Sequence, residues 1–98
     1  MILDEKTRGR LEQIIDNSIQ STPNIVKLLF NQQVRKRWSI ENQNDFSLGF
    51  ALGTIQNEFW TQFYNEYGRK PYQEELLEIS DIIFKRVPEI CNAIFNAG

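Results

Sequence analysis

The amino-acid sequence predicts an all-α fold: a compact bundle of four to five helices with a central aromatic-rich helix, in one domain over residues 1–98. Apolar residues recur at steps of three and four almost throughout the chain, which is the spacing of an amphipathic helix. No stretch of useful length alternates with period two, so we expect no sheet. The 98 residues, 41% of them hydrophobic, suffice for one modest core.

The first predicted helix covers residues 4–20 and places one apolar side toward the core. A second helix is expected to begin at Pro23, with Thr22 as its N-cap, because proline at a first helical position loses no hydrogen bond. It should run to Arg37 or Trp38 and end in cations, which the carbonyls of a helix end attract. The core-facing residues are Thr7, Leu11, Ile14, Ile15, Ser18 and Ile19 in the first helix, and Ile25, Val26, Leu29, Phe30, Gln33 and Val34 in the second.

The third helix should begin at a cap formed by Asn44 or Asp45 and extend to Tyr67, with Gly68 as a left-handed C-terminal cap. Its apolar residues cover roughly 220° of the helix circumference, whereas a surface helix needs little more than about 100°. This helix must therefore be covered on two sides, by its own domain alone or by its domain and another chain. The polar strip left over consists of Ser47, Thr54, Glu58, Thr61 and Asn65.

Two glycines, Gly49 and Gly53, lie four residues apart inside this third helix. Together they cost roughly 1.5–2 kcal/mol relative to alanine, and close approach of another backbone would compensate for that cost. The approaching backbone would be another helix of the same chain or the same helix of a second subunit.

The fourth helix is expected to open at Pro71, and Pro88 should either kink it or end it. Its core side comprises Tyr72, Leu76, Ile79, Ser80, Ile83 and Val87, and a second apolar stripe contains Leu77, Phe84 and Phe95. The third and fourth helices each have an apolar side that is wider than one core contact can cover. This predicts self-association as a homodimer, or contact with another protein. The residues assigned to the self-association surface are Gly49, Phe50, Gly53, Trp60, Tyr64, Leu77 and Phe84.

The composition excludes several classes of catalytic and metal-binding site. The chain has no histidine and a single cysteine, so His-dependent triads and most zinc sites are absent. We expect Cys91 to be a small buried hydrophobe, and we expect no catalytic residue, no metal ligand and no cofactor. The acidic residues Glu74, Glu75, Glu78 and Asp81 are expected to form a solvated helix face. The alternative is a magnesium-dependent phosphohydrolase that uses Glu75 and Glu78.

A basic cluster is the basis of the alternative function, a small nucleic-acid-associated protein, although the net charge is −2. Its residues are Arg35, Lys36, Arg37, Arg69 and Lys70. In the simpler interpretation the cations complement a helix end and Trp38 anchors that end in the core.

No apolar run approaches the roughly 20 residues that a membrane span requires, so we expect a soluble cytoplasmic protein. The favoured function is a non-catalytic interaction module.

Overall fold

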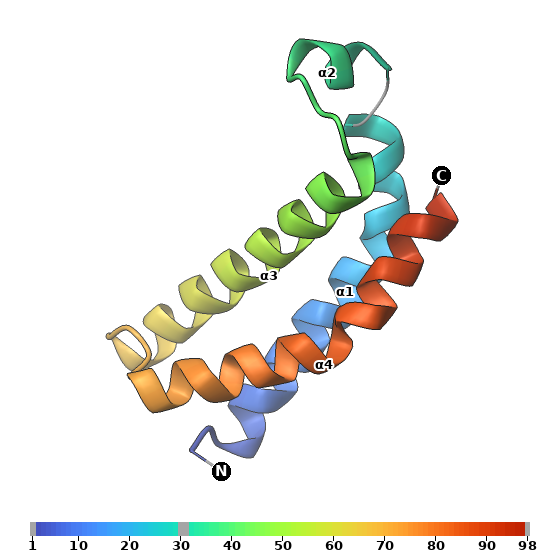
Figure 1. Cartoon of the computed structure of the whole chain (residues 1–98). Helices are drawn as coiled ribbons and strands as arrows, with labels where there is room; N and C mark the ends of the chain where they lie inside the picture. Colours follow the sequence, from blue (N-terminus) through green and yellow to red (C-terminus); the bar gives the residue numbers. More distant parts are fainter. Residues whose placement is uncertain (1, 30–31, 98) are drawn as a thin grey trace.

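The structure, a computed structural model, describes residues 2–29 and 32–97. It contains α1 (Glu5–Leu29), α2 (Gln32–Arg37), α3 (Gln43–Tyr67) and α4 (Gln73–Ala97), and the described residues form no strand. Figure 1 shows three long helices packed against one another, with the short α2 at one end. The predicted all-α bundle is confirmed.

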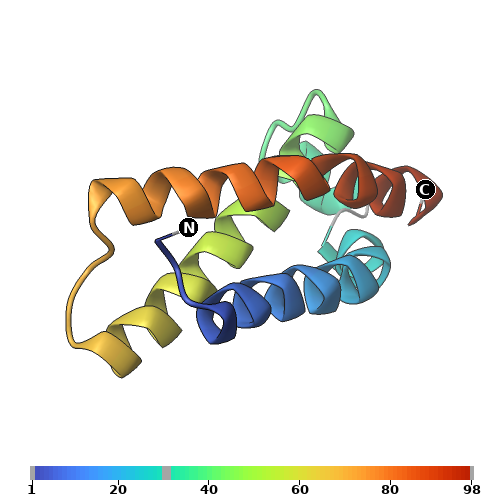
Figure 2. The same ribbon diagram turned by 90° about the horizontal axis from the view of Figure 1, so that it is seen from below.

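The helix α1 lies beside α4, and the two run in the same direction, whereas α3 runs the opposite way (Figures 1 and 2). The contact between α1 and α4 is the most extensive one, and α3 packs on both. The resulting molecule is elongated, with Cα dimensions of 43 × 22 × 18 Å. A three-helix body of this shape leaves one side of each helix uncovered by the rest of the chain.

The core lies where the three long helices meet, and each helix contributes one stripe to it. Phe59 of α3 is the largest fully buried side chain. Because these stripes follow the three- and four-residue spacing of the sequence, the predicted core side of the first helix is largely confirmed. In the fourth helix Ile79 and Ile83 are buried as predicted, but Tyr72 and Ser80 are exposed, so their predicted place in the core is wrong. The core consists of Leu3, Leu11, Ile14, Ile15, Ala51, Ile55, Phe59, Phe63, Ile79, Ile83, Ile90 and Ile94.

The predicted break before Pro23 is wrong, because α1 continues through this proline to Leu29. Thr22 is not an N-cap: its hydroxyl donates to the carbonyl of Ser18 at 2.6 Å. Thr22 and Val26 are both buried and continue the apolar side of α1. We attribute the continuous helix to this burial, which opposes a cost of about 3 kcal/mol for an interior proline.

The predicted second helix is therefore divided between the end of α1 and the separate α2. Phe30, which was assigned to its apolar side, lies outside the described residues. In α4 the open question of Pro88 is resolved as one helix, since α4 continues to Ala97. Ile90 and Ile94 are buried beyond the proline, in phase with Ile83 before it.

The ends of α3 and α4 are determined by side-chain and backbone caps. The N-cap of α3 is Asn42, whose side chain accepts from the backbone N–H of Asp45 at 3.0 Å, two or three residues before the predicted cap. Gly68 is the C-cap with φ 67°, as predicted, and its N–H donates to the carbonyl of Tyr64 at 2.8 Å. The helix α4 begins at Gln73 rather than at Pro71, because the Glu75 carboxylate caps the Tyr72 N–H at 2.7 Å.

The turn between α3 and α4 is held by Arg69. Its guanidinium donates to both carboxylate oxygens of Glu75, at 2.8 and 3.2 Å, and lies 3.8 Å from the centroid of the Tyr72 ring. Glu75 is only 7% exposed, so its predicted place on a solvated face is wrong. The hydrogen bond from Arg69, followed by the one from the Tyr72 backbone, lowers the pKa of Glu75 below its ordinary value.

Other acidic residues tie the N-terminal segment and α1 to the rest of the molecule. The backbone N–H groups of Ile2 and Leu3 both donate to Glu78 at 2.9 Å, and these bonds lower the pKa of that carboxyl. Arg86 of α4 pairs with Glu12 at 3.3 Å and with Asp16 at 2.6 Å, which joins α4 to α1. Glu75 and Glu78 thus have separate structural partners and do not form a shared cation site.

We expect the fold to lose stability as the pH falls below about 4.5, the ordinary pKa of a glutamate side chain. The folded-state pKa of Glu75 is lowered, so its stabilisation is complete above the unfolded-state pKa and disappears as the pH falls through the folded-state pKa. Urea denaturation between pH 3 and 7 measures this. Glu75→Gln should reduce the loss of unfolding free energy between neutral and acidic pH, whereas Glu74→Gln, at an exposed neighbour, should not. An equal loss of stability at acidic pH in the wild type and in Glu75→Gln would contradict the role given to Glu75.

Candidate self-association surface

One side of α3 is exposed along its whole length and carries no charged residue. Phe46, Gly53, Trp60 and Tyr67 recur on it every seven residues. At 100° per residue this side spans an arc of about 120°, opposite the part of α3 that contributes to the core. We call it the α3 face; it consists of Phe46, Gly49, Phe50, Gly53, Gln56, Asn57, Trp60, Tyr64 and Tyr67.

The two glycines of the α3 face have no neighbour in the rest of the described chain. A Cβ atom added at Gly49 or Gly53 would meet nothing within 4 Å. The interpretation that another helix of the same chain crosses here is therefore wrong for the described residues. We call the space left by the absent side chains of Gly49 and Gly53 the glycine notch. Phe46 precedes both glycines, Phe50 lies between them in the sequence, and Trp60 follows them.

A groove of about 550 Å³ adjoins the C-terminal part of the α3 face. Trp60, which is 47% exposed, forms one wall, and Pro71 and Leu76 form the opposite one. Lys70 is the only charged residue among those that line it. The complete lining is Trp60, Thr61, Tyr64, Asn65, Lys70, Pro71 and Leu76. This groove offers aromatic and aliphatic surface to an apolar side chain from outside the chain.

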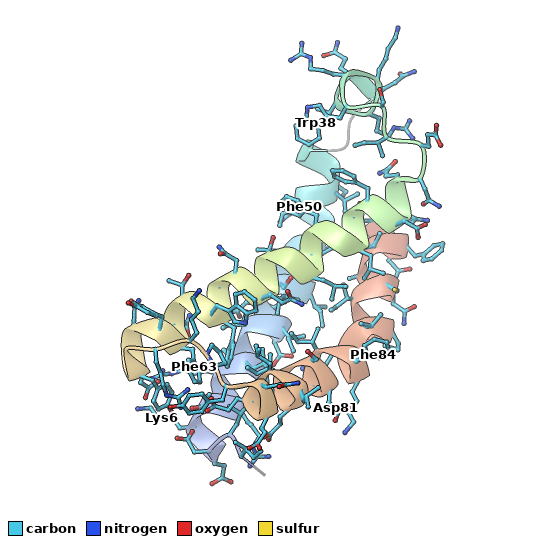
Figure 3. The ribbon with its side chains drawn as sticks, turned by 60° about the vertical axis from the view of Figure 1, so that its left-hand side comes forward. Lys6, Trp38, Phe50, Phe63, Asp81 and Phe84 are labelled. Carbon is cyan, nitrogen blue, oxygen red and sulfur yellow. The ribbon has the colours of Figure 1, made fainter. Side chains whose placement is uncertain are left out.

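The predicted self-association residues do not form one patch. Gly49, Phe50, Gly53, Trp60 and Tyr64 lie on the α3 face, whereas Leu77 and Phe84 lie on an exposed side of α4. Figure 3 shows Phe50 on α3 and Phe84, which is 78% exposed, on a different side of the molecule. Phe46 and Tyr67 belong to the α3 face but were not assigned to the surface from the sequence; their seven-residue spacing with Gly53 and Trp60 was the available signal.

The predicted basic cluster is likewise divided by the fold. Arg35, Lys36 and Arg37 form the end of α2, before α3 begins, and Arg69 and Lys70 follow the end of α3 (Figure 1). The helix α3, which has 25 residues and is about 36 Å long, lies between the two groups along the chain. Arg69 is also engaged with Glu75. No single basic surface results.

Two further predictions for single residues are corrected. Trp38 is 56% exposed rather than anchored in the core, and its ring lies 6.2 Å from that of Phe46. Cys91 is partly exposed rather than fully buried, because it lies between the core side of α4 and its outer side.

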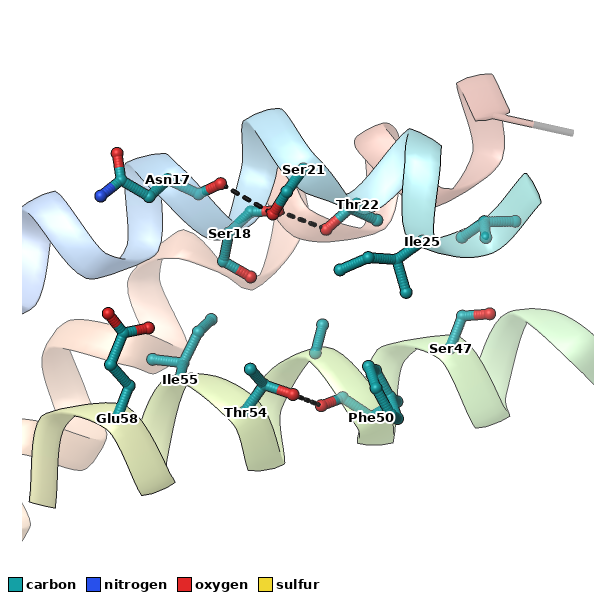
Figure 4. A pocket seen from close by; sticks show the side chains of 12 residues that line it. Asn17, Ser18, Ser21, Thr22, Ile25, Ser47, Phe50, Thr54, Ile55 and Glu58 are labelled. Carbon is teal, nitrogen blue, oxygen red and sulfur yellow. Dashed lines mark hydrogen bonds between the residues drawn. The ribbon is translucent and has the colours of Figure 1, made fainter. Parts of the chain in front are cut away.

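A second, smaller cavity of about 100 Å³ lies between α1 and α3 (Figure 4). Ser47 lines it and is 3% exposed, so its predicted place on an exposed polar strip is wrong. Among the residues that the structure describes, the Ser47 hydroxyl has no hydrogen-bond partner. The lining is Asn17, Ser18, Ser21, Thr22, Ile25, Val26, Ser47, Phe50, Ala51, Thr54, Ile55 and Glu58.

Comparisons of the chain with protein-family models, with curated proteins and with solved structures find no match. Over residues 2–29 and 32–97, no helix is long and apolar enough to cross a membrane. In the same part of the chain, no three cysteine or acidic side chains converge where they could hold a metal ion.

Replacing Gly49 or Gly53 by alanine should stabilise the monomer by about 1 kcal/mol each, because alanine is the better helix former and the added methyl group meets open space. Gly9→Ala in α1 should have the same effect for the same reason and serves as the matched control. Urea denaturation at low protein concentration measures the change. Destabilisation at Gly49 or Gly53 but not at Gly9 would show that the surroundings of the notch differ from those described.

Proposed function

We propose that this chain is a non-catalytic helical interaction module that self-associates as a homodimer through the α3 face. The observation that carries the proposal is the arrangement of large and small residues on that face. Aromatic side chains stand at both ends and the glycine notch lies nearer the N-terminal end. A second copy, turned by a two-fold rotation, offers an aromatic side chain to each glycine.

The register of an antiparallel α3 pair follows from this arrangement. With the two-fold axis between Gln56 and Asn57, Trp60 faces Gly53 of the second copy and Tyr64 faces its Gly49. The glycines would let the helix axes approach closely, and the aromatic rings would fill the space that the absent side chains leave. Gln56 and Asn57, the two amides of the face, would meet across the axis and could hydrogen-bond to each other.

Electrostatics and area support a second copy in this place. The α3 face contains no charge, so pairing it would desolvate none, and antiparallel helices oppose their dipoles favourably. Two helices of about 36 Å packed along their length bury an area near the lower limit of roughly 1,000 Å² for a specific interface. The groove beside Trp60 would add to this area by receiving Phe46 or Phe50 of the second copy. We therefore expect a reversible dimer of folded monomers.

Trp60→Glu should convert the dimer to a monomer, weakening association at least tenfold, because a carboxylate would be buried without a partner. Light scattering behind a sizing column, over a range of loading concentrations, measures the mass, and circular dichroism verifies the fold. Phe84→Glu is the matched control, since Phe84 is exposed on α4 and lies outside the α3 face. A folded Trp60→Glu variant with the mass of the wild-type dimer would refute the proposal, as would a wild-type chain that stays monomeric at all concentrations.

Cysteine cross-linking tests the register. In a Cys91→Ser background, Asn57→Cys should form a disulfide-linked dimer on mild oxidation, because the two copies of this position lie beside the axis. Tyr64→Cys should not, since its copies would be about 22 Å apart in the antiparallel pair. Efficient cross-linking of both variants would indicate parallel packing instead and would contradict the proposed register.

Gly53→Ala separates stability from association. It should stabilise the monomer but weaken dimerisation, since its methyl group would occupy the space expected for Trp60 of the second copy. Gly9→Ala should stabilise the monomer and leave the dimer dissociation constant unchanged. Sedimentation equilibrium on the two variants measures that constant, and equal dimer affinity in both would contradict a role for the notch.

A further inference from the structure

The basic residues that the monomer keeps apart lie at the two ends of α3. Residues 35–37 end α2, shortly before the N-terminal end of α3, and Lys70 follows the C-terminal end of α3. Within the described part of the chain, none of these four cations forms an ion pair with a carboxylate, whereas Arg69 is paired with Glu75. The four cations are therefore free to bind an anion from outside.

Two contacts place these cations on the same side of α3. Arg35 donates to the side chain of Gln43, the first residue of α3, at 3.2 Å. Lys70 lines the groove together with Thr61. Gln43 and Thr61 are 18 residues apart, which corresponds to five full helical turns, so both lie on one side of α3. The two groups of cations thus border the same edge of the α3 face, at its opposite ends.

The antiparallel dimer proposed above would bring these two ends together. A two-fold axis between Gln56 and Asn57 relates position 43 of one copy to position 70 of the other, and the same side of each helix meets across it. The helix axes of a packed pair are about 8–10 Å apart. Arg35 of one copy and Lys70 of the other could then both reach a group that lies between them.

The cations that meet at each end of this dimer would outnumber the acids. Asp45 is about 200° around α3 from Gln43, so it lies on the other side of the helix. Glu41 and Glu74 are the other acidic residues close in sequence, so four cations stand against two acids. Like charges that meet across an interface repel each other unless an anion lies between them. The arrangement favours a ligand with negative charges.

An exposed aromatic ring lies beside these charges. Trp38 directly follows α2, is 56% exposed, and has its ring 6.2 Å from that of Phe46 at the N-terminal end of the α3 face. Figure 3 shows it at the end of the molecule where α2 lies. Cations that flank an exposed ring suit a single-stranded nucleic acid, because the phosphates pair with the cations and the bases stack on the ring.

We propose, on the basis of the proposed dimer, that each of its ends binds a single-stranded nucleic acid across the subunit interface. Residues 35–37 and Trp38 of one copy and Lys70 of the other form the site. The net charge of −2 does not prevent this, because salt at about 0.1 M screens charges beyond about 10 Å.

The first test measures binding of a fluorescein-labelled oligothymidine of about 15 nucleotides to the full chain by anisotropy. We expect a dissociation constant on the order of 10 µM at about 50 mM salt, rising roughly 50-fold at about 200 mM for four phosphate contacts. Lys70→Gln should weaken binding at least about threefold and reduce the salt dependence by one contact. Lys85→Gln is the matched control, because it removes an exposed cation that pairs with Asp81 on α4.

The stacking surface is tested separately. Trp38→Ala should weaken oligothymidine binding at least about fivefold, since stacking of one base contributes about 1 kcal/mol or more. A duplex of the same length should bind more weakly than the single strand, because its bases are already stacked on one another. Equal binding of both, with no effect of Trp38→Ala, would overturn the assignment to a single strand.

Mixing two variants tests whether the site is shared between subunits. Dimers of an Arg35→Gln, Arg37→Gln double variant have two defective ends, and so do dimers of Lys70→Gln. A mixed dimer has one intact end, so an equal mixture should recover wild-type affinity at about a quarter of the wild-type number of sites. Subunit exchange is verified by energy transfer between labelled copies, and exchange without recovery of binding would overturn the shared site.

Light scattering on the same samples separates this proposal from the dimer on which it rests. A dimeric wild type that does not bind oligothymidine, or binds it with no effect of Lys70→Gln, would overturn the shared site and leave the dimer intact. A wild type that is monomeric at every concentration, with and without oligothymidine, would overturn both.

Discussion

The parallel packing of α1 against α4 determines what remains for α3 to cover. The stripes of α1 and α4 bury each other, with Ile15 and Ile90 completely inaccessible, and Arg86 joins the two helices outside this contact. The helix α3 closes the remaining open side with a single stripe centred on Ile55 and Phe59. Its apolar arc is wider than that stripe, so the surplus stays on the surface as the α3 face. The exposed aromatic surface is thus a consequence of how three helices of equal length share one core.

The turn after α3 depends on this arrangement and determines the geometry of the groove. Arg69 is six residues from Glu75, and it contacts the rings of Phe63 and Tyr72 as well as the buried carboxylate. Guanidinium groups satisfy carboxylates and aromatic faces together because they are planar and have several donors. Pro71 and Leu76, which line the groove together with Trp60, follow Arg69 and flank Glu75 in the sequence, so this Arg69–Glu75 contact lies next to the groove.

Hydrophobic periodicity was sufficient to predict the all-α class, the approximate ranges of α3 and α4 and most of the core, because burial follows the spacing of apolar residues. It was insufficient where a polar residue is buried with or without a partner. Glu75 has the sequence context of a solvated acid, and only the turn brings Arg69 to it. Ser47 lies at a core position of α3, but its residue type suggested solvent. Because proline is disfavoured inside a helix, Pro23 was predicted to mark a helix boundary. The buried residues on both sides of it keep the helix continuous instead.

The candidate surface was predicted in part for the same reason. The excess apolar width of α3 was visible in the sequence, but its separation from Leu77 and Phe84 required the orientation of α4. The division of the basic residues required the antiparallel course of α3, which separates the chain before it from the chain after it. In each case the sequence indicates which residues share a helix face, and only the packing of helices determines which faces meet.

The two glycines are the strongest argument that the α3 face is used. Each costs about 1 kcal/mol in a helix interior relative to alanine, and a methyl group at either position would meet nothing in the described chain. Neither has the left-handed φ that favours glycine at Gly68. No contact within residues 2–29 and 32–97 therefore offsets the cost, and close approach of another chain is a physical effect that would. In the proposed dimer, a second copy of α3 would meet this requirement with the side chains that the face already carries.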